Sequence, residues 1–144
     1  MIALSAQGLH RVVTTKRTET SILHGCDLEL QGGGLTAVVG HSGSGKSSLL
    51  MCLSGLDEPT SGTVTINGRD VYQQSAVKRA KMLRSEVGFV FQQYNLVPFL
   101  TVEENIALLF LLDHEPAPHD LVRDLIESFG LGRCSRSVDR KSVV

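Results

Sequence analysis

The chain has 144 residues, 42% of them hydrophobic, with 14 basic and 15 acidic residues and a formal net charge of −1. This length suits one compact domain with a real core and is short for two. Because the charges are balanced and spread along the sequence, nucleic acid and anionic membranes are not expected as partners, and any phosphate binding has to be local.

Two features of the composition bear on location. The cysteines lack metal-ligand spacing, and their odd number is a poor framework for disulfides, which favours a reducing, cytoplasmic setting for Cys26, Cys52 and Cys134. The longest apolar run, Ile106 to Leu112, is far below the roughly 18 residues needed to cross a bilayer. We therefore expect no direct insertion into a membrane.

The first third of the chain has the patterns of three strands. Leu4 to Val13 and Cys26 to Leu30 carry short apolar alternations on either side of a polar stretch, which predicts two half-buried strands joined by an exposed loop. Leu35 to Val39 is a brief continuous apolar run rich in valine, which is typical of a strand covered on both faces. This run is expected to be the central strand.

A helix and a hairpin should follow. From Lys46 the leucines recur at helical spacing, and Gly55 is placed to end the helix. The Asn67-Gly68 step lies between two short runs of strand-forming residues and predicts a β-hairpin. Residues 75–85 then form a basic helical stretch, and Val87 to Phe91 is an apolar run that predicts another strand.

The last third is predicted to be mainly helical. Thr101, followed by acidic residues and an apolar run, predicts a helix to about His114, and His119 to Phe129 predicts a second helix that Gly130 ends. After Gly132 the sequence has little periodicity and should be loosely held. We therefore expect a domain over residues 1–132 and an irregular tail over residues 133–144.

One motif carries clear chemistry. The stretch GHSGSGKS matches the pattern G-x-x-x-x-G-K-[ST] at every fixed position and lies between a predicted strand and a predicted helix. Glycines allow successive backbone N–H groups to turn inward around phosphate oxygens, and the helix adds its positive end. The residues expected to hold the triphosphate of ATP are Gly40, His41, Ser42, Gly43, Ser44, Gly45, Lys46, Ser47 and Ser48.

The side chains of this loop have separate expected tasks. The Lys46 ammonium suits the β- and γ-phosphates, and the Ser47 hydroxyl is a hard oxygen ligand for Mg²⁺. A plain glycine turn capped by serine is the structural alternative. His41 occupies a variable position of the pattern, so an exposed side chain is favoured over nucleotide contact.

Three segments in order, GHSGSGKSSLL, SGLDEPTSGTVTING and VGFVFQQYNLVPFLTVEENI, resemble the ATP-binding subunit of an ABC transporter. The chain is most similar to the group that serves lipoprotein release, macrolide-type export and related permeases, over about Leu4 to Gly132. The resemblance implies an α/β fold: a P-loop NTPase core, incomplete here, with a small antiparallel β element and the beginning of a helical subdomain.

The same resemblance implies further roles. Gln92 matches the glutamine that contacts Mg²⁺ and relays the nucleotide state to a transmembrane permease subunit, and Tyr94 to Leu100 would lie near that partner's coupling helix. A second ATP-binding subunit, as a homodimer in the complete protein, is also implied. The expected location is cytoplasmic and peripheral, at the inner face of the cell membrane.

Two departures from the family pattern are visible. Val13 stands where an aromatic ring usually stacks on adenine, and such stacking contributes about 1 to 3 kcal/mol in comparable systems. The chain also ends before the signature loop and the Walker B acidic pair, so we expect an N-terminal portion that binds ATP and is hydrolysis-deficient. The acidic segments Leu56 to Gly62 and Leu108 to Glu115 are interpreted as a surface turn and part of a helix.

Alternatives remain open at this point. A noncatalytic nucleotide-binding or interaction module would fit the same loop, whereas a GTPase or small-molecule kinase is disfavoured because no N-K-x-D or D-x-x-G motif occurs. The transported substrate is not encoded here. A parallel sheet without its later strands should be marginally stable and prone to aggregation. Exposed positions without a ligand role are expected for His114, His119, Lys78, Arg79, Lys81 and Arg84.

Overall fold

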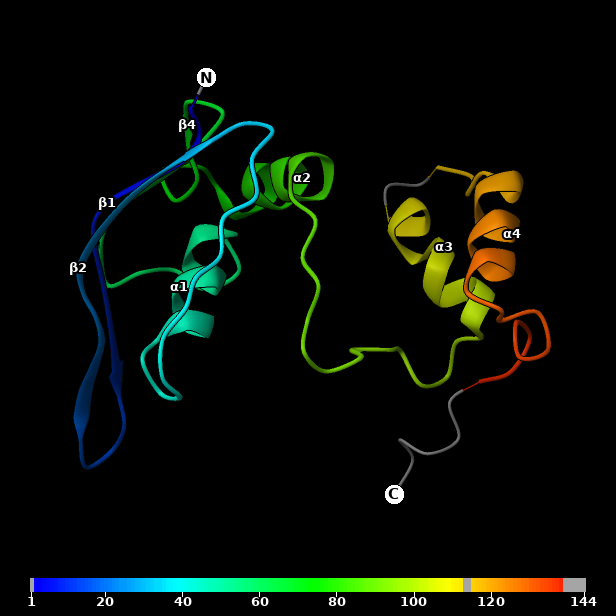
Figure 1. Cartoon of the computed structure of the whole chain (residues 1–144), viewed down its shortest axis with the longest axis horizontal. Helices are drawn as coiled ribbons and strands as arrows, with labels where there is room; N and C mark the ends of the chain where they lie inside the picture. Colours follow the sequence, from blue (N-terminus) through cyan, green and yellow to red (C-terminus); the bar gives the residue numbers. More distant parts are fainter. Residues whose placement is uncertain (1, 113–114, 139–144) are drawn as a thin grey trace. The chain divides into compact units, whose positions relative to one another are not determined.

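The computed structural model describes residues 2–112 and 115–138 (Figure 1). The chain divides into two compact units, Met1–Phe89 and Val90–Val144. The first unit contains a β-sheet and two helices, and the second contains two helices. No helix in the described ranges is both long and apolar enough to cross a membrane.

An antiparallel sheet organises the first unit. Strand β1 (Ile2–Thr14) pairs with β2 (Glu19–Gln31) and with β3 (Ser61–Ile66), and the short β4 (Arg69–Asp70) completes the order β2-β1-β3-β4. Figure 1 shows β1 and β2 as one long hairpin. The two strands predicted at its alternating segments are confirmed.

The β3–β4 turn is also as predicted. Asn67 and Gly68 both have positive φ, 49° and 75°, which is the backbone geometry of the two-residue turn that matches the twist of a hairpin. Glycine adopts this geometry without strain, and asparagine is the other residue that tolerates it well. The local sequence therefore determined this turn.

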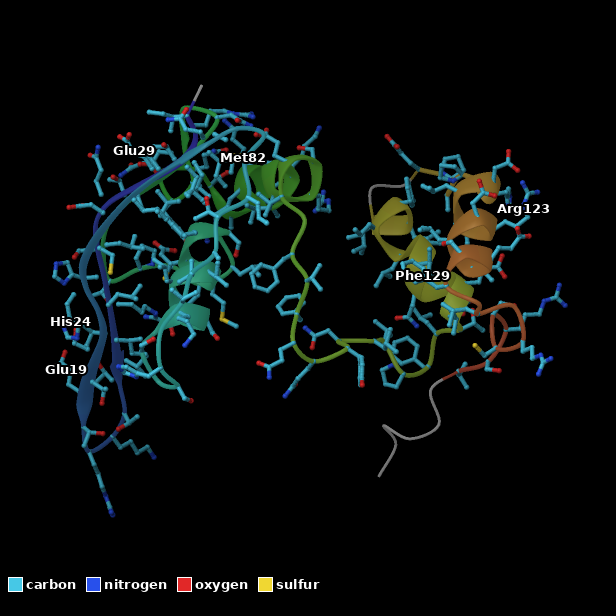
Figure 2. All side chains as sticks on the ribbon, in the orientation of Figure 1. Glu19, His24, Glu29, Met82, Arg123 and Phe129 are labelled. Carbon is cyan, nitrogen blue, oxygen red and sulfur yellow. The ribbon has the colours of Figure 1, made fainter. Side chains whose placement is uncertain are left out.

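The core of the first unit lies between the sheet and its helices. Helix α1 (Lys46–Leu53) buries Cys52 and Leu53, and α2 (Ala76–Glu86) contributes Met82, which is labelled in Figure 2. Both helices were predicted near these bounds. The buried residues that form the core are Ala6, Leu9, Leu23, Cys52, Leu53, Val64, Ile66, Val71 and Met82.

Two predicted strands are wrong. Leu35 to Val39 and Val87 to Phe91 have no strand structure, and the side chains of Leu35 and Val90 are 100% and 96% exposed. A strand covered on both faces requires neighbours that pair with its backbone and layers that cover its side chains. In the described part of the chain, neither segment is a member of the sheet, so its apolar pattern alone does not produce a strand.

The second unit holds α3 (Val102–Leu112) and α4 (His119–Ser128), as predicted. At the start of α3, the Glu104 carboxylate accepts hydrogen bonds from the backbone N–H and hydroxyl of Thr101 at 2.7 and 2.9 Å, and the Glu104 N–H donates to the Thr101 hydroxyl at 3.2 Å. These reciprocal bonds form a capping box, which explains where the helix begins.

The segment after Gly132 is more ordered than expected. The N–H groups of Val102 and Glu103 donate to the carbonyls of Ser137 and Ser135 at 3.2 and 3.1 Å, and Thr101 forms a bridge with Val138. Residues 133–138 have irregular backbone and are hydrogen-bonded to the start of α3, and the domain boundary at residue 132 stays a prediction. Residues 139–144 lie outside the described residues.

Candidate functional site

The glycine loop leads directly into α1 and is anchored at its last glycine. Gly45 is the N-cap of α1, with φ of 86°, and its carbonyl accepts the Leu49 N–H at 2.8 Å. A Cβ at this position would lie 3.0 Å from the carbonyl oxygen of Ile22 and 3.3 Å from the Cδ2 atom of Leu23. Both the positive φ and the close approach of β2 therefore require glycine here.

Lys46 turns its ammonium group into the loop. Its Nζ atom donates to the carbonyl oxygens of Gly40 and His41 at 2.9 and 2.7 Å, and it lies 3.4 Å from Ser44 Oγ. These acceptors are neutral, whereas a phosphate oxygen is charged and forms hydrogen bonds roughly twice as strong. The ammonium is thus placed where an anion bound within the loop would reach it.

The other loop residues leave this region open to solvent. Ser42, Gly43, Ser44 and Ser47 are exposed, and Ser48 is half-buried. Gly43 also has positive φ, 78°, and nothing lies within 4 Å of the position that a Cβ would take. The first turn of α1 contains no acidic residue, so the positive end of the helix is not offset locally.

His41 makes a local contact. Its Nδ1 atom lies 2.9 Å from the carbonyl oxygen of Ser42, and since a carbonyl only accepts, Nδ1 carries the proton in this geometry. The residue is exposed in the structure, and whether it contacts a nucleotide stays a prediction.

The far end of α1 is anchored by Tyr72. Its hydroxyl lies 2.7 Å from the carbonyl oxygens of both Cys52 and Asp57, in the last turn of α1 and in the turn that follows. Burial raises the pKa of the Tyr72 phenol, so this group is a neutral donor. Helix α1 is therefore held by β2 at its start and by Tyr72 at its end.

The acidic pair after α1 is engaged in ion pairs. Asp57 accepts two hydrogen bonds of 2.8 Å from the Arg11 guanidinium on β1, and Glu58 lies 3.3 Å from Arg79 on α2. Such pairing is expected of residues that fix a turn, in line with the interpretation of Leu56 to Gly62 as a surface turn. Arg79 also lies 5.2 Å from the centre of the Tyr72 ring.

The remaining candidates divide clearly. Lys78, Lys81 and Arg84 are exposed on α2, as expected, but Arg79 is half-buried in the contacts just described. His119 is exposed at the start of α4, and His114 lies outside the described residues. In the ranges that the structure describes, no three His, Cys, Asp or Glu side chains form a cluster that could hold a metal ion.

Two further predicted residues lie away from the loop in sequence. Val13, near the end of β1, is 38% exposed. Gln92 belongs to the second unit and is exposed on an irregular segment, together with Tyr94 and Phe99, whose side chains are 93% and 78% exposed.

The residues that support the loop have no local signal in the sequence. Ile22, Leu23 and Arg11 contact the loop or the turn after α1. Arg11 lies within a predicted strand, and Ile22 and Leu23 lie just before the strand predicted at Cys26 to Leu30. Their partners lie more than 20 positions away, and no local pattern reports such contacts. The close approach at Gly45 becomes visible only when β2 and α1 are placed together.

Similarity to a solved structure shows the class of protein to which this fold belongs. The fold is that of a P-loop NTPase: the structure of the ATP-binding cassette MJ0796, a dimer in a post-hydrolysis state bound to ADP and Pi, is similar with a TM-score of 0.81 and 27% identity, over 94% of this chain and 61% of that chain. The family model described as ABC transporter matches residues 23–142. The chain therefore belongs to the ABC transporter family.

Curated relatives agree with this family. LolD 1 of Rhodopirellula baltica, a lipoprotein-releasing system ATP-binding protein, is 42% identical over 123 residues, which are 84% of this chain and 54% of the relative. The macrolide export ATP-binding/permease protein MacB of Bdellovibrio bacteriovorus is 33% identical over 128 residues, 89% of this chain and 20% of the relative. The predicted resemblance is confirmed, and the chain spans about half the length of LolD 1.

Proposed function

We propose that residues 40–48 bind Mg-ATP and that this chain is the nucleotide-binding part of an ABC transporter, within a domain over residues 1–132. The observation that carries the proposal is the Lys46 ammonium inside an open glycine loop, within 2.9 Å of two loop carbonyls. A triphosphate would replace these neutral acceptors with charged oxygens, and backbone N–H groups at the start of α1 would donate to it.

The residues present fit a magnesium ion bound together with the nucleotide. Ser47 offers an exposed hydroxyl beside the lysine, and oxygen ligands with phosphate oxygens and water are what Mg²⁺ prefers. Gln92 is proposed as a second protein ligand, on the family pattern. The bound ion would neutralise charge on the β- and γ-phosphates.

Recognition of the base is proposed to be weak. Val13 presents an aliphatic side chain, 38% exposed, where the family pattern has an aromatic ring. An aliphatic group offers contact area without stacking, so most of the affinity should come from the phosphates. Because ATP and GTP have the same triphosphate, we expect the preference for ATP over GTP to be modest.

The proposed partners are a transmembrane permease subunit and a second ATP-binding subunit. MJ0796 forms a dimer, and LolD 1 and MacB belong to release and export systems. The exposed side chains of Tyr94, Leu96 and Phe99 would face the permease. Such partners would place the chain in the cytoplasm at the inner face of the cell membrane, where the complete protein couples ATP binding and hydrolysis to transport.

We further propose that these 144 residues alone bind ATP without hydrolysing it. Support comes from the acidic pair that follows α1, because Asp57 and Glu58 are occupied by Arg11 and Arg79. In this proposal, neither carboxylate orients an attacking water. Hydrolysis requires a group in that role as well as a cradle for the phosphates.

Lys46→Ala tests the proposal against Lys78→Ala, which removes an exposed lysine from α2. Losing charged hydrogen bonds to phosphate should weaken ATP binding by about 10- to 100-fold, whereas the control should bind as the unaltered chain does. Equilibrium dialysis with ATP, with GTP as competitor, and an assay for released phosphate measure the outcomes. Equal affinity of the two variants, or GTP selectivity, would refute the assignment.

A further inference from the structure

Strand β2 contains an irregularity beside the phosphate loop. Arg11 and Val12 are consecutive on β1, but they pair with Leu23 and Ser21 on β2, so Ile22 is an extra residue without an opposite partner. This is a β-bulge, and bulges redirect a side chain and its backbone while disrupting the ladder locally. Bulges are also over-represented next to functional sites.

The bulge is directed at the last glycine of the loop. A Cβ on Gly45 would lie 3.0 Å from the Ile22 carbonyl oxygen and 3.3 Å from the Ile22 Cγ2 methyl group. Ile22 is half-buried and packs against the core, so its position is fixed by the sheet. The carbonyl and the methyl group of Ile22 together form the surface against which Gly45 packs.

The loop has little other packing. Residues 31–44 are all exposed, and the preceding segment Leu35 to Val39 has no strand structure. Gly45 is thus the first residue of this region that packs closely against the sheet. A loop that is free on one side loses conformational entropy when it closes on a ligand, and a fixed anchor reduces that loss.

We propose that Ile22 is a positioning residue for phosphate binding: the bulge fixes Gly45, and through it the first amides of α1 and the Lys46 side chain. This inference rests on the proposed nucleotide binding. Ile22 acts on the phosphates through Gly45, so its influence should be the same for a ligand that has no base or sugar.

Two conservative changes separate positioning from simple hydrophobic burial. Ile22→Leu keeps the number of carbons but has no methyl group on Cβ, whereas Ile22→Val keeps that methyl and loses one carbon. Hydrophobic burial alone would rank leucine above valine. Positioning of Gly45 by the Cγ2 methyl group requires the opposite ranking, because valine keeps a methyl group on Cβ and leucine does not. The backbone carbonyl of residue 22 is present in both variants.

The experiment measures Kd for ATP and for inorganic tripolyphosphate, together with the thermal midpoint, on the full chain. Ile22→Leu should weaken binding of both ligands by about three- to tenfold, and Ile22→Val by less than about twofold. Leu28→Ala, at a half-buried position elsewhere on β2, should lower the thermal midpoint with both Kd values unchanged.

Four results would overturn the inference. The first two are an unchanged Kd in Ile22→Leu and a larger effect of Ile22→Val than of Ile22→Leu. The third is weaker binding of ATP with tripolyphosphate binding unaffected, which would mean a contact with base or sugar. The fourth is an equal loss of affinity in Leu28→Ala. If instead the unaltered chain binds neither ligand, the proposed function itself fails.

Discussion

The strands of the antiparallel sheet and two other segments have similar apolar side chains but differ in structure. These two segments, Leu35 to Val39 and Val87 to Phe91, are irregular. In the sheet, Leu9 and Val64 are fully buried, yet Leu35 and Val90 are almost fully exposed. Short turns join β1 to β2 and β3 to β4, and β3 also pairs with β1 across a long connection. In the described part of the chain, the other two segments belong to no sheet. An apolar run therefore becomes a strand only where a partner backbone meets it.

The physical basis is the backbone as much as the side chains. A hairpin places a neighbouring strand within a few residues, so its hydrogen bonds form at a low entropic cost of loop closure. A parallel neighbour has to come from a dozen or more residues away. Exposed apolar segments of this kind favour association between chains, and the expected aggregation stays a prediction.

The largest expected difference in stability is between an aspartate placed in the sheet and an aspartate placed in the segment Val87 to Phe91. Val64→Asp puts an unpaired carboxylate at a fully buried position of β3, which should destabilise the first unit by about 3 to 5 kcal/mol. Val90→Asp changes a residue that is 96% exposed and should alter stability by less than about 0.5 kcal/mol. Urea unfolding followed by circular dichroism measures both. Similar losses would mean that the second segment is buried in solution.

A smaller effect on stability is expected where the side chain of Asn105 forms the hydrogen bonds that hold a backbone segment. Asn105 accepts the Val97 N–H at 2.8 Å, and its amide group lies 3.2, 3.2 and 3.0 Å from the carbonyls of Val97, Leu100 and Thr101. These bonds fix the irregular segment that leads into α3.

Asn105→Ala removes all of these bonds and should lower the local opening free energy by about 1 to 3 kcal/mol, so the Val97 amide should exchange about 10- to 100-fold faster. Hydrogen exchange followed by NMR measures this. Leu109→Ala, on the exposed face of the same helix, is the control and should leave the Val97 rate unchanged. Equal rates in both variants would show that other contacts hold the segment.

The smallest effect concerns pH at the start of α3. Hydrogen bonds from the Thr101 backbone and hydroxyl lower the pKa of Glu104. The bonds therefore stabilise the helix start above the ordinary pKa of glutamate, and this contribution disappears as pH falls through the lowered value. Because Glu104 is fully exposed, we expect fraying of the first turn with the rest of the helix intact.

Amide exchange at Thr101 and Asn105, measured from neutral to acidic pH, follows this fraying. Glu104→Gln stays neutral at every pH. This variant should remove the pH dependence of the protection of these amides relative to their intrinsic exchange rates. An unchanged acid dependence in that variant would assign the fraying to another group.

The sequence by itself determined the phosphate loop, the helices and the Asn67-Gly68 turn, because each depends on local chemistry. Positive φ, helical spacing and an ammonium five or six residues from its acceptors are all encoded within a short stretch. Family membership followed from three such stretches in order. The positions of these features could be predicted without knowing what surrounds them.

Only the tertiary structure decided which apolar runs became strands and what supports the loop. Leu35 to Val39 has the composition of a buried strand, but pairing depends on a second segment that composition does not supply. The contact between Ile22 and Gly45 depends on a bulge in the register of β1 and β2, two strands whose alternating patterns gave no sign of it. Long-range contacts of this kind are properties of two segments together, which is why neither segment alone could reveal them.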